Sequence, residues 1–187
     1  LPVLETTGAS GTTDKSGTAN SILKDEIGNL NQITGFVPDD SVAKSVTITY
    51  RPESTVYVAE RYGVFYEDDT WKDIEHSGKD DEEEMWEHME DYLSCPTDLQ
   101  KLTRYYIEEI GGIDGEWKDS KSEIEAIRKK ICEALWELAV YDTEPGATPA
   151  GKDFVEYFLF ENRKGFCVHF ASAGTLLFRL AGKEARY

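Results

Sequence analysis

The chain has 187 residues, enough for one domain with a substantial hydrophobic core or for one domain with a small appendage. It is 40% hydrophobic and carries a formal net charge of −17. Because a surface this acidic repels phosphate backbones and anionic lipid headgroups, nucleic acid is not an expected partner. No apolar run approaches the roughly 18–20 residues that cross a bilayer, and no signal peptide is recognised. Because the first residue is Leu1 and not methionine, we expect a soluble piece of a longer protein.

The N-terminal part is predicted to be a flexible linker followed by a small β-rich unit. Residues 1–20 are rich in Gly, Thr and Ser without periodicity, which is typical of a linker. Residues 21–33 allow one short helical turn. Alternating and β-branched residues between 44 and 75, with a turn at 66–71, predict an antiparallel β-unit. We place this unit over residues 21–78.

Helical periodicity begins at residue 79 and predicts a helical subdomain over 79–187. The segment 97–111 is expected to be a helix that has Thr97 or Asp98 as its N-cap and ends at the glycine pair beginning with Gly111.

The segment 120–141 is the best amphipathic helix of the chain. Ser120 and Glu123 have the spacing of a capping box. Its predicted buried face consists of Ile124, Ile127, Ile131, Leu135 and Leu138.

The C-terminal segment is predicted to contain a loop and two helices. Two prolines exclude regular structure over 142–151, and a short aromatic helix follows with Asp153 as its cap. The last helix is expected from about Phe166 to Ala181 and ends at Gly182. Because this helix is apolar on nearly every side, it should be the central element of the domain.

Cys167 lies in the first turn of that last helix, directly after a glycine-containing segment. Unpaired backbone N–H groups and the helix dipole at this end stabilise an anion, so they favour the thiolate, which is the nucleophilic form of cysteine. The backbone N–H of Cys167 is also placed to donate to an oxyanion. A small buried hydrophobic thiol is the alternative reading of any single cysteine.

The segment "DFVEYFLFENRKGFCVHFASAGTLLFRLAGKEARY" resembles the core motif of the bacterial transglutaminase-like superfamily. The matching positions are Gly165, Cys167, His169, Phe170, Ala171, Gly182 and Arg186. A looser similarity extends upstream, over the β-segment before residue 75 and the helices at 97–141. The sequence departs from the motif at Lys183-Glu184, where the family usually has Ile-Pro.

The resemblance implies an α+β protein of the papain-like class, in which Cys167 is the nucleophile of a Cys-His-Asp triad. Its thiolate would attack a carboxamide, usually of glutamine, to form a thioester that an amine or water resolves. The expected substrates are therefore proteins or peptides that present glutamine side chains and amines, including cell-wall peptides. The resemblance also implies a parent anchored on the extracellular face of a bacterial membrane.

In the family the histidine and the acid follow the cysteine on strands of a sheet, which would begin here at Tyr187. We therefore expect the catalytic sheet to be truncated and the present chain to be inactive. Among the histidines of the chain, His169 is about 200° around the helix from Cys167 and is expected to have a structural role. His88 and His76 are expected to be a solvated helix residue and a loop residue.

The remaining candidates carry no predicted chemistry. The acidic run after residue 79 lacks the oxygen spacing of a calcium loop, so no metal and no cofactor is expected. Cys95 and Cys132 could form a disulfide, although two free buried thiols fit the sequence better. The alternative function is a non-catalytic protein-binding module on the same fold.

Overall fold

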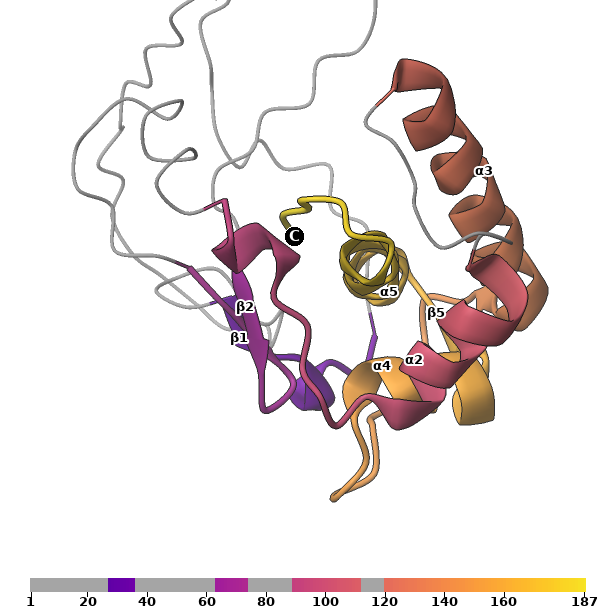
Figure 1. Cartoon of the computed structure of the whole chain (residues 1–187). Helices are drawn as coiled ribbons and strands as arrows, with labels where there is room; N and C mark the ends of the chain where they lie inside the picture. Colours follow the sequence, from indigo (N-terminus) through magenta and orange to yellow (C-terminus); the bar gives the residue numbers. More distant parts are fainter. Residues whose placement is uncertain (1–26, 36–62, 74–88, 112–119) are drawn as a thin grey trace, which may run out of the picture. The chain divides into compact units, whose positions relative to one another are not determined.

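The structure is a computed structural model, and it describes residues 27–35, 63–73, 89–111 and 120–187. All of these residues belong to one compact unit. Figure 1 shows the order of its helices and strands along the chain. The predicted linker over 1–20 lies outside the described residues, and the predicted boundary between 78 and 79 stays a prediction.

A small antiparallel sheet is formed by three short strands in the order β1-β3-β2. The strands are β1 (Ile27–Asn29), β2 (Phe65–Glu67) and β3 (Thr70–Lys72). The β2–β3 hairpin turns at Asp68 and Asp69, whose φ angles of 48° and 57° match the left-handed backbone that two-residue hairpins favour. The turn predicted at 66–71 is therefore confirmed. A 3-10 turn, η1 (Leu30–Gln32), follows β1.

Two short helical segments, η2 (Asp91–Leu93) and α2 (Gln100–Tyr105), precede a π-helical turn, η3 (Tyr106–Ile110), which ends at Gly111 as predicted. The predicted N-cap is wrong, because Leu99 occupies that position and no side chain near it caps the helix. The Glu156 carboxylate supplies the missing acceptor from another helix, since it accepts from the N–H groups of Lys101 (2.6 Å) and Leu102 (3.1 Å).

Ser120 is the N-cap of helix α3 (Lys121–Leu138), and its side chain accepts from the N–H of Glu123, which is one half of the predicted capping box. The Glu123 carboxylate accepts from the Ser120 hydroxyl at 2.8 Å. The buried face is confirmed for Ile127, Ile131 and Leu135, and Leu138 is half-buried. Ile124 is an exception at 44% exposure, because it lies in the first turns of the helix, before the buried positions begin.

The predicted end of this helix near residue 141 is wrong. Val140–Tyr141 form strand β4, which pairs in parallel with β5 (Lys164–Gly165). The N–H groups of Val140 and Asp142 donate to the carbonyls of Arg163 and Gly165. These tertiary hydrogen bonds, which the local sequence does not encode, replace the last helical turn.

The C-terminal helices follow the sequence prediction closely. Helix α4 (Phe154–Tyr157) is capped by Asp153, which accepts from the N–H of Glu156 at 2.7 Å, and it continues as the π-helical turn η4 (Phe158–Asn162). Helix α5 (Cys167–Leu180) ends before Gly182, whose φ of +70° requires glycine-like freedom.

Helix α5 is the centre of the hydrophobic core, with α3 and α4 packed against it. In Figure 1 it is seen end-on between the three-stranded sheet and α3. The fold combines helices with small sheets, which confirms the α+β class. No helix in the described part of the chain is long and apolar enough to span a membrane.

A candidate cysteine site at the start of helix α5

Cys167 is the first residue of α5, and its side chain is exposed, whereas Cys95 and Cys132 are half-buried. The N–H groups in the first turn of a helix have no acceptor within that helix, so they can donate to an anion beside the thiol. The structure therefore places Cys167 at the N-terminal tip of the central helix, as the sequence predicted, and shows in addition that its side chain is exposed.

Gly165 brings the chain into this position by a close contact that excludes any side chain. A Cβ atom at Gly165 would lie 2.6 Å from Cγ of His169 and 2.7 Å from a ring carbon of Phe158. Both neighbours belong to rings packed in the core, so they cannot move aside cheaply. Glycine at this position lets β5 pass directly over the His169 ring before the chain turns into α5.

Arg163 fixes the other end of β5. Its backbone has a φ of 59°, and its guanidinium donates to the carbonyls of Leu138 (2.5 Å) and Glu137 (2.9 Å) at the C-terminal end of α3. These carbonyls have no partner within the helix, so the arginine satisfies them and binds β5 to α3.

His169 has a structural role, as predicted. It is 3% exposed, and its Nδ1 accepts a hydrogen bond from the N–H of Phe166, the N-cap residue of α5, at 3.3 Å. The rings of Phe154, Phe158 and Phe166 surround it at centroid distances of 4.5–5.1 Å. Burial lowers the pKa of His169 to about 4, so the imidazole is neutral at physiological pH. Its acceptor nitrogen is thus engaged at the helix terminus, and it is not available as a base for Cys167.

A stack of aromatic rings supports α5 from the side of the sheet. Trp71 on β3 donates from Nε1 to the Ser172 hydroxyl (2.9 Å) and stacks on Tyr187 with 5.1 Å between ring centroids and 4° between planes. The pKa of the Tyr187 phenol is raised to about 12, first by burial and second by the charge of Cys167.

Arg179 connects three chain segments near the C-terminal end of α5. It is 3% exposed, and it donates to the carbonyls of Val64 (2.6 Å), Ser94 (2.8 Å) and Ala185 (2.7 and 2.9 Å). Burial lowers its pKa to about 10, which still leaves it charged at neutral pH. The segment around Ala185 is thereby aligned so that Tyr187 and Gly63 exchange both backbone hydrogen bonds.

A cluster of acids that the sequence reasoning missed lies around the β2–β3 hairpin. The Tyr66 hydroxyl lies 2.9 Å from an Asp153 oxygen and 3.2 Å from an Asp69 oxygen. Asp69 also accepts from the N–H of Phe154 (2.6 Å) and from the Asn31 amide. Burial, together with the nearby Asp69, raises the pKa of Asp153 to about 7. In the sequence, only the adjacent acids Asp68 and Asp69 in the turn at 66–71 indicated such a cluster.

These acids line a cleft of about 750 Å³, which is bounded by the hairpin, by residues 94–98 and by residues 151–153. Cys167 does not line it, and Asp69 and Asp153 are used as backbone acceptors. In the described residues no group of three His, Cys, Asp or Glu side chains is arranged to hold a metal. The cluster therefore serves to attach the hairpin to α4.

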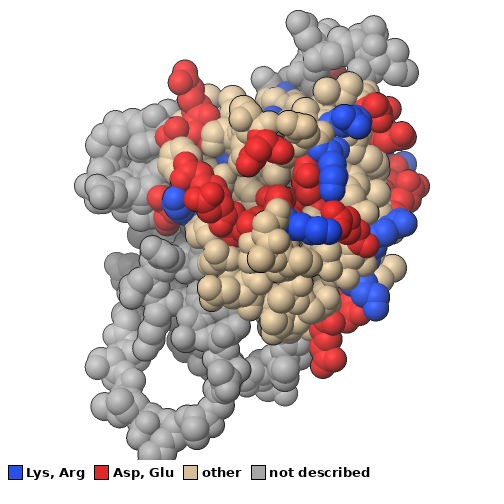
Figure 2. Space-filling model, turned by 90° about the horizontal axis from the view of Figure 1, so that it is seen from below, with Lys and Arg blue, Asp and Glu red and all other residues tan. Residues whose placement is uncertain are grey.

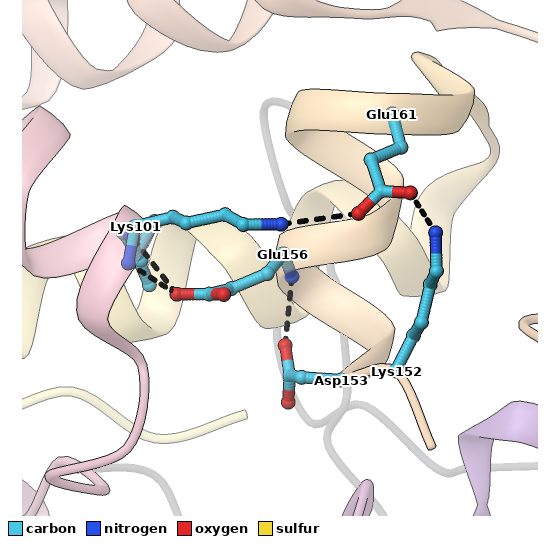
Figure 3. Close-up of polar contacts among 6 residues, drawn as sticks. Lys101, Lys152, Asp153, Glu156 and Glu161 are labelled. Atoms are coloured by element: carbon cyan, nitrogen blue, oxygen red, sulfur yellow. Dashed lines mark hydrogen bonds and ion pairs between the residues drawn. The ribbon is translucent and has the colours of Figure 1, made fainter. Parts of the chain in front are cut away.

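Figure 2 shows a face on which acidic and basic side chains are intermixed. Two ion pairs hold Glu161 of η4, one with Lys101 of α2 and one with Lys152. Figure 3 shows Glu161 between Lys101 and Lys152. It also shows the Glu156 side chain reaching from α4 to the backbone at the start of α2. The Lys101–Glu161 pair spans 3.0 Å. These contacts are exposed, so their role is to orient the helices and not to form a site.

The other two cysteines are free thiols, which agrees with the preferred reading of the sequence. Burial raises the pKa of Cys95 to about 11, with Asp153 and Asp98 adding to the shift and Arg179 opposing it. Cys95 is thus held in the unreactive thiol form at neutral pH. His76 and His88 lie outside the described residues.

Comparison with known proteins gives one result. Residues 111–187 match the family model of the transglutaminase-like superfamily. The match covers the chain from α3 to Tyr187, which includes β4, α4, β5 and α5. Neither a search of curated proteins nor one of solved structures finds a match.

Proposed function

We propose that this chain, whose residues 111–187 match the family model of the transglutaminase-like superfamily, carries the nucleophile of a cysteine enzyme that transfers acyl groups from carboxamides. The observation that supports this most directly is the exposed thiol of Cys167 at the first position of α5, within the segment that matches the family. The half-buried Cys95 and Cys132 have no comparable access to a substrate.

The proposed reaction has two steps. The Cys167 sulfur attacks the carbonyl carbon of a glutamine carboxamide, the C–N bond breaks, and ammonia leaves with the proton that the thiol has given up. The first-turn N–H groups of α5 would stabilise the oxyanion of the intermediate. An amine then attacks the thioester and forms a new amide, or water attacks and forms a carboxylic acid, and the thiol is regenerated in either case.

A base must carry the proton between these groups, and it is not found among the described residues. His169, the only histidine among them, is buried and accepts from the N–H of Phe166. By the family resemblance, a histidine and an acid would follow residue 187 on strands of a sheet. Tyr187 and Gly63 exchange both backbone hydrogen bonds, as two residues paired in an antiparallel sheet do, so Tyr187 already has the pairing of a strand residue.

The finer expectations from the resemblance remain part of this proposal. They are a papain-like arrangement of the complete catalytic domain, a bacterial parent tethered at the extracellular face of the membrane, and protein or cell-wall peptide substrates.

The first test measures acylation of the chain with an activated acyl ester at neutral pH, followed by peptide mass spectrometry. We expect the acyl group on Cys167, in preference to Cys95 and Cys132, and no labelling at that position in Cys167→Ala. Equal modification of all three thiols, or none at Cys167 in the folded chain, would refute a privileged nucleophile.

A second test incubates the chain with a glutamine donor and a labelled amine. We expect no turnover from these 187 residues, since the nucleophile needs a base and an acid for the leaving group. Sustained amine incorporation would show that a base is present after all, with His76 and His88 as the residues to substitute first.

The alternative is a non-catalytic binding module, which is favoured by the lack of a base for Cys167 among the described residues. Reading the parent gene beyond residue 187 discriminates the two functions. A histidine followed by an aspartate in strand-like surroundings supports the enzyme, and their absence supports the binding module.

A further inference from the structure

The Tyr66 hydroxyl joins the β2–β3 hairpin to α4, and it contacts two carboxyl groups at once. It lies 2.9 Å from Oδ2 of Asp153 and 3.2 Å from Oδ1 of Asp69. The phenol keeps its single proton, because burial and, after it, the charges of the two acids raise the pKa of Tyr66. A hydroxyl group has one proton to donate, so it satisfies only one of the two carboxyl groups.

Each carboxyl group also accepts a backbone N–H of α4. Asp69 accepts from Phe154 (2.6 Å), and Asp153 accepts from Glu156 (2.7 Å). With both acids ionised, the contact of Tyr66 with the second acid is one between two acceptor oxygens. An extra proton on the pair turns this contact into a hydrogen bond, because a protonated carboxyl group donates to the phenol oxygen while the hydroxyl donates to the other acid.

The charged groups around this junction supply little positive charge. The titratable groups that line the same cleft or follow on α4 are Glu67, Asp68, Cys95, Asp98, Lys152 and Glu156. The lysine among them pairs with Glu161. Burial, together with the nearby Asp69, raises the pKa of Asp153 to about 7, which agrees with a proton shared by the two acids.

We propose that Tyr66, Asp69 and Asp153 form a proton-dependent latch, which holds the β2–β3 hairpin on α4 when the two acids share an extra proton and loosens it when that proton is lost. The latch opens as the pH rises, because the proton is bound in the closed state and released in the open state. This device goes beyond the proposed function and does not depend on it.

The hairpin also carries the contacts that hold Tyr187. Trp71 of β3 donates to the Ser172 hydroxyl of α5 (2.9 Å) and stacks on the Tyr187 ring. Gly63, two residues before β2, exchanges both backbone hydrogen bonds with Tyr187. Opening of the latch therefore loosens the attachment of Tyr187 beside α5.

Hydrogen exchange measured by NMR between pH 5 and pH 8 tests the latch. The N–H of Phe154 reports the contact with Asp69, and the indole N–H of Trp71 reports the contact with α5. Each rate is divided by the rate of the same proton in Asp153→Asn at the same pH, which removes the intrinsic pH dependence of exchange. The asparagine keeps an oxygen that caps α4 and adds a permanent donor, so this variant stays latched at every pH.

Both ratios should rise by up to about tenfold per pH unit between pH 5 and pH 7, because opening releases one proton, and should level off above pH 7. Asp68→Asn is the matched control, because it removes an exposed acid of the same turn, and its ratios should follow those of the parent chain. Asp69→Asn replaces the other acid of the pair, and its ratios should stay constant with pH.

Ratios of the parent chain that stay constant from pH 5 to pH 8 would overturn the latch. A rise at Phe154 without one at Trp71 would overturn release of the hairpin, since the change would then be confined to the start of α4. An equal rise at the amide of Leu177, in the core of α5, would show unfolding of the whole domain and would also overturn a local latch. None of these measurements involves acylation of Cys167, so the latch and the proposed function can fail separately.

Discussion

The substitution Gly165→Ala tests the close contact on which the position of Cys167 depends. The added methyl group would lie 2.6–2.7 Å from Cβ and Cγ of His169 and from the Phe158 ring. Forcing one extra carbon into a packed core costs about 1–3 kcal/mol. Displacing the imidazole would also break its hydrogen bond to the Phe166 N–H, which is worth about 1 kcal/mol. We therefore expect a loss of about 2–4 kcal/mol in the free energy of unfolding.

Gly174→Ala, within α5, is the matched control. A Cβ at Gly174 meets only a methyl group of Leu135 at 3.8 Å, an ordinary van der Waals contact. Since glycine within a helix is less stable than alanine by about 0.5–1 kcal/mol, this variant should be more stable than the parent chain. Urea unfolding of both variants gives the comparison. If the two substitutions change stability in the same direction, the argument from the close contact fails.

Three further predictions concern single side chains. Burial lowers the His169 pKa from 6.5 to about 4, so His169 contributes about 3 kcal/mol of stability that is complete above pH 6.5 and is lost as the pH falls towards 4. Urea unfolding at a series of pH values should show this loss. The variant His169→Gln, which can still accept from the Phe166 N–H, should not show it. Asp153 acts in the opposite direction, because its pKa is raised from 3.8 to about 7. Its contribution to stability is therefore present below pH 3.8 and is lost as the pH rises through 7. Asp153→Asn should remove that decline in stability, and an unchanged pH profile would contradict the prediction. Glu156→Ala should destabilise the chain by about 1 kcal/mol, because the N-terminus of α2 loses its acceptor. Amide hydrogen exchange should accelerate first at Lys101 and Leu102, and a uniform acceleration over all amides would argue against a local cap.

Local sequence determined the elements whose signals are contained within a few residues. Ser120 and Asp153 cap α3 and α4 because a side-chain oxygen three residues before a free N–H needs no distant partner. The apolar period of α3 and the nearly uniform apolarity of α5 placed both helices in the core. The register from Gly165 to Arg186 indicated the family, which the match over residues 111–187 bears out.

Tertiary structure decided what depends on partners far away in the chain. The N-terminus of α2 takes its acceptor from Glu156, 54 and 55 residues away, so the local prediction of Thr97 or Asp98 as cap was wrong. Val140 and Tyr141 form a strand and not a helical turn, because Arg163 and Gly165 offer carbonyls to that segment. The cluster of Tyr66, Asp69 and Asp153 likewise unites residues that no local pattern connects. Capping and amphipathic burial are encoded within a few turns of chain, whereas hydrogen-bond partners and ring contacts between segments exist only after the chain has folded.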